Sequence, residues 1–265
     1  VLTRSLIHDN GASQKGKGTG FAMERLVGHL RWHFQRFGNE GYILLVDFSD
    51  YFGTIDHEIA KQIIAAAFDD PGIIWLANLF IDAYYEFNVK FKKIPEEEAH
   101  KGLGLGSEIN QTIAITYPNR LDHYIKEVLG IKCYGRYMDD FYLIVQNKEY
   151  AKLCLSAIYE FVHTLCLELN GKTQIIPLKN GIKFCGFHTY VTLDGKVIRK
   201  LKNENRRAAK KKFKKMTRLV NSDKLSKERF YESYNAWKNH ISHGNCVKLG
   251  HEMDRYIEKL FIGEK

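Results

Sequence analysis

Cysteine, proline and long apolar runs are all scarce in this sequence of 265 residues. The five cysteines are an odd number and include no Cys-x-x-Cys pair, so we expect reduced thiols and no disulfide framework. No apolar run reaches the length of a membrane span, and no signal-peptide pattern opens the chain. These absences predict a cytoplasmic protein without a membrane partner. The sequence begins at Val1 rather than at Met, which is compatible with a longer natural chain.

Zinc ligands at a recognisable spacing are also lacking. One group of histidines and a cysteine could in principle hold zinc, but its spacing matches no common zinc site. The group also spans the junction of two predicted helices, so we do not expect a zinc centre there. Its members are His240, His243, Cys246 and His251.

The positive charge of the chain is concentrated in one segment. The formal net charge is +9, yet the stretch from Lys196 to Arg218 holds twelve Lys or Arg and one acid, Glu204, a local net of +11. The remaining residues carry 28 basic and 30 acidic side chains, a net of −2. A solvated helix face would carry a more even mixture of charges, so this segment predicts contact with a polyanion such as a nucleic acid.

The stretch GRYMDDFYLIV, residues 135 to 145, places two adjacent acids inside an apolar run. Unpaired carboxylates in an apolar setting are costly, and they usually become protonated or bind a metal. One interpretation is a hairpin with Asp139 and Asp140 at the turn between strands 133–137 and 141–145. The other is a cation site, and both can hold at once.

The periodicity of apolar residues predicts mixed helices and strands up to residue 193. A Gly- and Lys-rich loop at 13–20 leads into a helical pattern, and 42–48 is apolar up to Asp47, as in a strand covered on both faces. Asp56 is placed to cap the next helix. This order is typical of an α+β core rather than a regular βαβ series. The further elements that we expect are a helix from Pro71-Gly72 to about 85, a hairpin at 89–106, helices at 108–128 and 149–169, and strands at 173–177 and 182–191.

After Leu193 the pattern predicts helices only. Three amphipathic segments follow one another, and Gly244 is placed to end the second. Together they predict a small three-helix bundle with the basic residues outside it. The apolar positions of the first segment are Ala209, Phe213, Met216 and Val220.

Asp47 stands at the end of a predicted buried strand, 92 residues before Asp139. If both segments belong to one antiparallel sheet, three carboxylates can meet at one edge. Such a cluster can hold two Mg²⁺ about 3.5–4 Å apart, an arrangement that activates an attacking hydroxyl and stabilises a leaving group. Each acid alone is better explained as a turn residue or a helix cap.

Five motifs in order give the chain a resemblance to reverse transcriptases. VDFSDYF (46–52) resembles the first palm motif, and GLGLGSEINQ (102–111) resembles the template-and-nucleotide loop. YMDD (137–140) is similar to the signature turn of the family. LELNGKT (167–173) and IKFCGF (182–187) resemble the lysine-bearing motif and the primer grip. YxDD alone is a weak pattern, whereas five ordered motifs are specific.

The resemblance implies the fold, the activity and the partners. The fold is α+β, a right-handed polymerase with partial fingers at 1–40 and 84–105, a palm with an antiparallel sheet at 41–83 and 106–192, and a thumb at 193–265. The activity is RNA-directed DNA polymerisation, with Mg²⁺ as cofactor and Mn²⁺ as its substitute. The partners are an RNA template, a DNA or RNA primer and dNTPs, with an accessory protein or a non-coding RNA as further candidates. LGSEINQ in the loop is closest to enzymes of diversity-generating retroelements, so we expect a bacterial enzyme near the retroelement, retron and defence-associated group.

The resemblance also assigns catalytic and metal-binding residues. Asp47, Asp139 and Asp140 would be the catalytic, metal-binding triad, with the carbonyl of Phe48 as a further ligand. Lys172 would protonate the pyrophosphate leaving group. A plain surface lysine is an equally simple interpretation of that residue.

Nucleotide contacts are implied at two motifs. Backbone amides of Asp50 and Tyr51 would meet the triphosphate, and Phe52 would exclude a ribose 2′-hydroxyl. Gly106 would let the backbone approach the nucleotide or template closely, with Gln111 beside it. Ordinary core packing would also explain an aromatic residue at Phe52.

Primer and template contacts are implied at four places. For two of these places a structural interpretation is the alternative: a plain β-hairpin at 184–186 and a flexible turn at 15–19. The residues concerned are Lys15, Lys17, Tyr137, Met138, Phe184, Cys185, Gly186, Arg206, Arg207, Lys210, Lys211, Lys214 and Arg218.

Three departures from the family pattern bear on these assignments. Leu105 stands where many relatives have glutamine, and Asn110 replaces a common serine. The early fingers motif that clamps the triphosphate would lie before Val1, unless Lys15 and Lys17 take its place. Two alternatives stay open: an RNA-dependent RNA polymerase, which Phe52 and Met138 disfavour, and a non-catalytic nucleic-acid-binding scaffold of the same fold.

Overall fold

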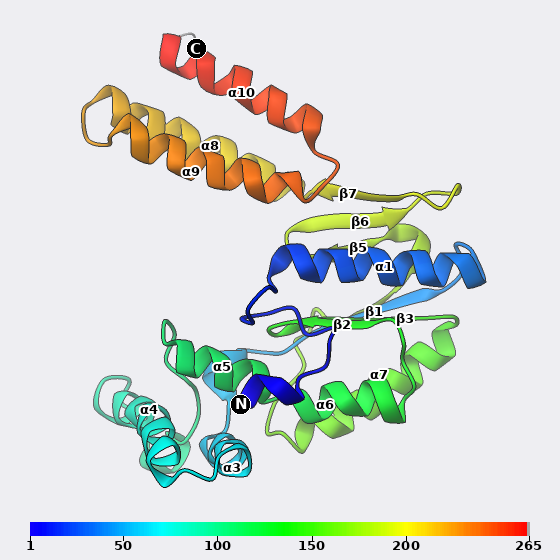
Figure 1. Cartoon of the computed structure of the whole chain (residues 1–265), viewed down its shortest axis with the longest axis vertical. Helices are drawn as coiled ribbons and strands as arrows, with labels where there is room; N and C mark the ends of the chain where they lie inside the picture. The colour runs from blue at the N-terminus through cyan, green and yellow to red at the C-terminus, as the bar shows by residue number, and fades with distance from the viewer. Residues whose placement is uncertain (264–265) are drawn as a thin grey trace. The chain divides into compact units, whose positions relative to one another are not determined.

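The computed structural model describes residues 1–263, so the last two residues of the expected bundle lie outside it (Figure 1). Contacts divide the chain into two compact units, residues 1–178 and the residues from 179 onward, which we call the N-terminal and C-terminal units. In the described part of the chain, every helix is too short or too polar to cross a bilayer.

The N-terminal unit is built on an antiparallel sheet in the order β2-β3-β1-β4. The central strand β1 pairs with β3 so that Tyr42 faces Val145 and Asp47 faces Asp140. The apolar run in β1 is buried because helix α1 lies on one face of the sheet and helices α6 and α7 lie on the other (Figure 1). The strands are β1 (Tyr42–Asp47), β2 (Tyr134–Tyr137), β3 (Asp140–Val145) and β4 (Gln174–Pro177).

Four helices of this unit, α3, α4, α5 and α7, begin at side-chain caps. Asp56 Oδ1 accepts from the Ile59 amide at 3.0 Å, which confirms the predicted cap of α3. Asp70 caps α4, whose first residue is Pro71, because proline suits a position whose amide has no partner in the helix. The helices are α1 (Thr19–Phe37), α2 (Tyr51–Thr54), α3 (His57–Ala67), α4 (Pro71–Lys90), α5 (Glu108–Thr116), α6 (Asn119–His123) and α7 (Lys148–His163). Short 3₁₀ or π turns occur at η1 (Leu2–Ser5), η2 (Glu96–Glu98), η3 (Tyr124–Val128) and η4 (Leu178–Asn180).

Two predicted elements of this unit are wrong. Residues 89–106 do not form a hairpin, because α4 continues to Lys90 and a single β-bridge joins Asp56 to Lys101 in that stretch. The predicted helix at 108–128 is interrupted after α5, where Pro118 has no backbone N–H to extend the helix.

The C-terminal unit combines a second antiparallel sheet with the helical bundle. Its strands run in the order β5-β6-β7, so the expected single strand at 182–191 is a hairpin. Residues 197–201 form β7, so the expectation of helices alone after Leu193 is wrong, while the three bundle helices are confirmed. The elements are β5 (Ile182–Phe184), β6 (Phe187–Val191), β7 (Val197–Leu201), α8 (Asn203–Asn221), α9 (Lys227–Ser242) and α10 (Val247–Ile262). The buried core of the bundle is Ala209, Phe213, Val220, Phe230, Tyr234, Met253 and Ile257.

Candidate active site

Two of the predicted carboxylates meet where β1 ends and the β2–β3 turn begins. The turn is formed by Met138 and Asp139, and Met138 has φ 56°, a left-handed conformation that is uncommon for a residue with a side chain. Partial burial raises the pKa of Asp47, and repulsion from Asp139 and a hydrogen bond shared with it raise the pKa further. The two side chains therefore lie within direct interaction distance, although 92 residues separate them in the sequence.

The third carboxylate, Asp140, begins the strand that pairs with β1. Asp140 faces Asp47 across the sheet, but its side chain is exposed. Among residues 1–263, no group of three or more His, Cys, Asp or Glu side chains is close enough to hold a metal ion. The structure thus brings Asp47 and Asp139 together, with the exposed Asp140 as the next residue along the chain. A pair of repelling carboxylates still fits a hard divalent cation, because Mg²⁺ is commonly bound by one or two carboxylates together with water and substrate oxygens.

The lysine-bearing motif lies directly beside this pair. The Ser49 amide donates to the Glu168 carbonyl at 2.8 Å, and the Asn170 amide donates to the Asp47 carbonyl at 2.7 Å. The exposed ammonium of Lys172 is near enough to offset part of the rise in the Asp47 pKa. The turn at 168–172 therefore places one cation near the Asp47 carboxylate.

The residues after Asp47 form a tight turn with two buried rings, Phe48 and Tyr51, and one half-buried ring, Phe52. Asp50 has φ 41° and precedes α2. Tyr51 is buried, stacks on Phe48 with centroids 5.2 Å apart, and donates its hydroxyl hydrogen to the Ala114 carbonyl. Its side chain is therefore structural, and only its backbone is left for a ligand. Phe52 is half-buried, packs against the main core and lies 5.7 Å from the Tyr51 ring, so both interpretations of Phe52 remain.

The glycine-rich loop is held by a side chain whose role the sequence did not indicate. Asn110 is buried, and its amide donates to the Gly104 carbonyl at 2.9 Å. Gly106 has φ 96° with open space around its Cα, a backbone conformation that favours glycine. Leu105 is 78% exposed, and the side-chain Oε1 of Gln111 accepts a long hydrogen bond from the Ser13 hydroxyl at 3.5 Å. At Gly106 the backbone of the loop is therefore accessible to a ligand.

The two lysines of the loop at 13–20 differ in their surroundings. Lys15 is exposed. The ammonium of Lys17 donates to the carbonyls of His8 and Asn10, both at 3.0 Å, and lies 5.2 Å from the centre of the Phe21 ring. Lys17 therefore fastens the loop to the preceding segment, and Lys15 is the more accessible cation.

In the C-terminal unit, the expected primer-grip residues form the β5–β6 turn. Cys185 and Gly186 both have positive φ, 45° and 84°. The Gly186 carbonyl accepts from Lys202 N at 3.3 Å and from Asn205 Nδ2 at 3.2 Å, which ties the turn to the start of α8. Phe184 is buried in this unit.

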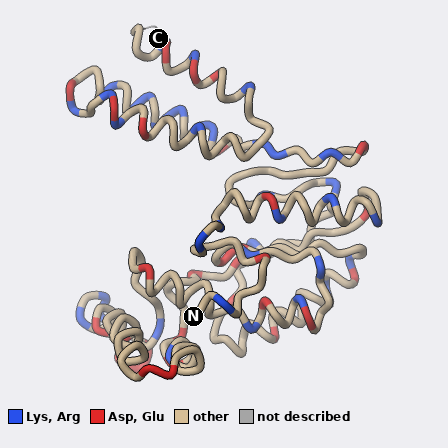
Figure 2. Tube along the Cα trace, viewed as in Figure 1, with Lys and Arg blue, Asp and Glu red and all other residues tan. Residues whose placement is uncertain are grey.

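Lys and Arg residues recur along α8 (Figure 2), and most of them are exposed. Two of the expected phosphate partners have protein contacts: Arg206 forms an ion pair with Glu252, and Lys210 lies 5.3 Å from the centre of the Tyr256 ring. The exposed remainder of the expected set is Arg207, Lys211, Lys214 and Arg218.

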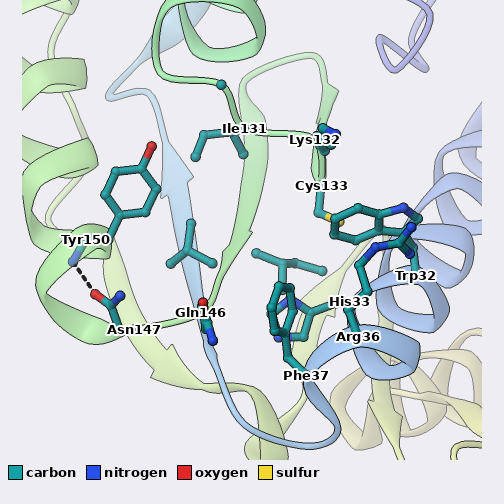
Figure 3. Close-up of a pocket in the computed structure, with 13 residues that line it drawn as sticks. Trp32, His33, Arg36, Phe37, Ile131, Lys132, Cys133, Gln146, Asn147 and Tyr150 are labelled. Atoms are coloured by element: carbon teal, nitrogen blue, oxygen red, sulfur yellow. Dashed lines mark hydrogen bonds between the residues drawn. The ribbon is translucent and has the colours of Figure 1, made fainter.

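A pocket of about 460 Å³ lies at the opposite end of the sheet from the Asp47–Asp139 pair (Figure 3). It is lined by residues of α1, the end of β3 and the start of α7, including Trp32, Arg36, Val145 and Tyr150. Arg36 lies over the Trp32 ring at 4.0 Å. Since β3 runs from Asp140 to Val145, this pocket is not part of the candidate active site.

Sequence reasoning overlooked one charged residue beside the site. Arg136 precedes the turn in β2 and is fully buried against Asp122, which is also fully buried. The only signal in the sequence was an arginine within a strand of otherwise apolar or aromatic residues.

Comparisons with known proteins agree with this geometry. A family model described as reverse transcriptase (RNA-dependent DNA polymerase) matches residues 7–189. Among solved structures, the chain is similar to telomerase from Candida albicans in complex with a TWJ fragment of telomeric RNA, with a TM-score of 0.53 and 13% identity over 82% of this chain. The chain spans 39% of the length of that telomerase chain. At this identity the likeness shows a polymerase fold of helices and antiparallel sheets. A search of curated proteins gives no match.

Proposed function

This chain belongs to the reverse transcriptase (RNA-dependent DNA polymerase) family, and from that premise we propose that it extends a primer 3′-hydroxyl with dNTPs on an RNA template. The main support is the meeting of Asp47 and Asp139 beside Lys172, which brings three family motifs together at one edge of the sheet. Each of these residues comes from a different part of the sequence, so simple local turn formation does not explain their assembly.

The roles of the site residues follow from their chemistry. Asp47 and Asp139 would hold a divalent cation, Mg²⁺ or its substitute Mn²⁺, with Asp140 and the Phe48 carbonyl as further ligands. When bound, the cation lowers the pKa of the primer hydroxyl and neutralises charge on the phosphates. Lys172 donates a proton to the leaving pyrophosphate.

The nucleotide is oriented by the residues that follow Asp47. Backbone amides of Asp50 and Tyr51 bind the triphosphate, and Phe52 excludes the 2′-hydroxyl of a ribonucleotide. Gly106 and Gln111 border the nucleotide on its other side. Both residues belong to the loop and helix that Asn110 helps to position.

We assign the larger parts of the fold by the same family pattern. The sheet β2-β3-β1-β4 is the palm, the partial fingers comprise 1–40 and 84–105, and the bundle of α8, α9 and α10 is the thumb. Lys15, the 184–186 turn and the outer face of α8 contact the primer and template. The enzyme belongs to the bacterial retroelement, retron and defence-associated group, acts in the cytoplasm, and works with an accessory protein or a non-coding RNA.

Primer extension on an RNA template tests the proposal. The wild-type protein should extend with dNTPs, and Asp139→Asn should reduce extension to background while template binding is retained. The melting temperature of Asp139→Asn should not fall, because the substitution removes the charge that repels Asp47. Asp69→Asn, in an exposed loop, is the matched control and should be fully active. Full activity of Asp139→Asn would refute the assignment of the site.

The same assay separates the alternatives. Extension with rNTPs in preference to dNTPs would indicate an RNA-dependent RNA polymerase. Binding of template and primer without extension in any nucleotide mixture would indicate a non-catalytic scaffold.

A further inference from the structure

Among residues 1–263, Arg136 is the largest fully buried side chain, and it lies two residues before the turn formed by Met138 and Asp139. Its partner Asp122 lies 14 residues earlier, in α6, and is also 0% exposed. The guanidinium binds the carboxylate in a bidentate manner, with Nη2 to Oδ2 at 2.6 Å and Nε to Oδ1 at 2.8 Å. Tyr134 adds a third donor to Asp122 through its hydroxyl.

The guanidinium also binds two backbone carbonyls on separate elements. Nη2 donates to the Ile115 carbonyl, near the end of α5, at 2.8 Å. Nη1 donates to the Met138 carbonyl at 2.9 Å. One side chain therefore connects α6, α5 and the turn. The Met138 carbonyl belongs to the peptide bond that leads directly into Asp139.

The backbone of Arg136 is fixed as well. Its amide donates to the Asp9 carbonyl at 3.1 Å, and its carbonyl accepts from the Gly11 amide at 2.9 Å. The side chain is thus anchored at its base by the N-terminal segment and at its tip by Asp122. An arginine held at both ends is a rigid support for the one turn atom that it touches.

Stability alone does not account for this arrangement. A buried ion pair contributes little net stability, because desolvation offsets the attraction, and an apolar pair of similar volume is often as stable or more so. What an apolar pair cannot do is donate to the Met138 carbonyl. That contact fixes a residue in a left-handed conformation, which persists only when its surroundings enforce it.

We propose that Arg136 and Asp122 are positioning residues for the reaction: by holding the Met138 carbonyl they keep the Asp139 carboxylate beside Asp47. The guanidinium of Arg136 donates to Asp122, Ile115 and Met138 rather than to the carboxylates of Asp47 and Asp139. Its effect on catalysis is therefore indirect. The inference rests on the proposed polymerase function for its kinetic consequences, whereas its structural consequence can be measured without any activity.

Two variants separate positioning from stability. The double variant Arg136→Met/Asp122→Leu removes both charges and leaves no unpaired ion in the core. Arg136→Lys keeps a cation for Asp122 but cannot reach the Ile115 and Met138 carbonyls at the same time. The matched control is Lys61→Met/Asp82→Leu, which removes a partly exposed ion pair between α3 and α4 in the same unit.

Positioning predicts a selective kinetic effect. In primer extension, both Arg136 variants should lose 10- to 100-fold in kcat, while the KM for dNTP and the Kd for template and primer stay within about twofold of wild type. The melting temperature of the double variant should fall only modestly, because the buried Tyr134 hydroxyl loses its Asp122 acceptor. The control pair should leave every parameter at its wild-type value. Wild-type kcat in a folded Arg136→Met/Asp122→Leu protein would overturn the proposal.

Hydrogen exchange provides the readout that is independent of activity. In both variants the amides of residues 138–140 should exchange at least tenfold faster, while the amides of β1 that pair with the middle of β3 keep their protection. Unchanged exchange at the turn overturns the inference even if the protein proves not to be a polymerase. Loss of the native circular dichroism spectrum in Arg136→Lys also overturns it, because the pair would then be a requirement for folding itself.

Discussion

At the scale of single residues, Phe52 is the side chain whose two possible roles predict different outcomes. Its ring packs on the main core, and it also occupies the position at which the family pattern has a steric gate. Phe52→Val should raise rNTP incorporation relative to dNTP, because it opens space where the 2′-hydroxyl of the incoming nucleotide would lie. Removal of such a clash changes discrimination by roughly 1–3 kcal/mol. The measurement is the ratio of kcat/KM values for the two nucleotides on one RNA template.

A second phenylalanine controls for the loss of core packing. Phe68 is a partly buried residue packed against the same core, at the end of α3. Phe68→Val should reduce stability without changing the nucleotide ratio. An unchanged ratio in Phe52→Val would assign Phe52 to the core alone and would favour the RNA-polymerase alternative.

The sequence predicted the meeting of Asp47 and Asp139 because both stand at strand ends and belong to ordered motifs. It could not predict Arg136, since a single cation in a strand gives no indication of its partner until the fold brings α6 to β2. The involvement of Lys17 with backbone carbonyls was hidden for a similar reason. Motif order predicts which residue types assemble, whereas hydrogen bonds to the backbone depend on exact three-dimensional distances.

At the scale of elements, α1 is held to the sheet by a buried polar cluster that should respond to pH. His29 Nδ1 lies 3.0 Å from the Tyr142 hydroxyl of β3, and its Nε2 lies 3.6 Å from Asp9. Burial lowers the pKa of His29 to about 4, partly offset by Asp9, and Arg25 and Lys126 lower it further. Asp9 itself has a lowered pKa because hydrogen bonds from Lys126 and Arg25 and the charge of His29 outweigh its burial.

The sign of the pH effect follows from the histidine. Because its folded pKa lies below its ordinary value of about 6.5, the unfolded chain takes up a proton between about pH 6.5 and 4 that the folded chain does not. Stability should therefore fall as the pH falls through this window, by up to roughly 3 kcal/mol. His29→Gln keeps a polar group near Tyr142 and cannot titrate, so its melting temperature should depend less on pH there. His163→Gln, at the exposed end of α7, should keep the wild-type dependence, and equal slopes for all three proteins would contradict the prediction.

Helices and strands were predicted correctly where the sequence pattern follows directly from which residues are buried. The apolar run of β1 and the spacing in α8 correctly predicted their elements, because both are set by a continuous buried face. β7 was missed because Arg199 and Lys200 lie within a basic stretch that resembles the helix after it. The hairpin predicted at 89–106 was wrong. The alternating apolar and basic residues at its start belong in part to α4, which continues to Lys90.

At the scale of the whole molecule, the asymmetry of charge should govern association with nucleic acid. The segment 196–218 carries a net charge of +11 and the rest of the chain −2, so one part of the molecule holds the excess. In the structure that segment comprises β7 and most of α8, and the apolar side of α8 is occupied by the core of the bundle. The basic residues of α8 occupy the other positions of the helix, and most of them are exposed.

The last prediction concerns the salt dependence of template–primer binding. Each phosphate neutralised by a lysine releases condensed counterions and contributes about −0.9 to the slope of log K against log[salt]. Replacing Lys210, Lys211 and Lys214 with glutamine should flatten that slope by roughly one to three units, at every template sequence tested. Folding should survive, because the buried positions of α8 are Ala209, Phe213, Thr217 and Val220, none of which is changed.

A control of equal charge decides whether location or net charge is responsible. Replacing Lys148, Lys152 and Lys179 with glutamine removes the same three charges from exposed positions outside the basic segment. If the segment itself contacts phosphate, this control keeps nearly the wild-type slope, because screening at about 0.15 M salt confines charge effects to roughly 8 Å. Equal flattening in both triple variants would mean that net charge alone drives binding. Parallel slopes for the α8 variant and the wild type would mean that the basic face of α8 contacts something other than the template and primer.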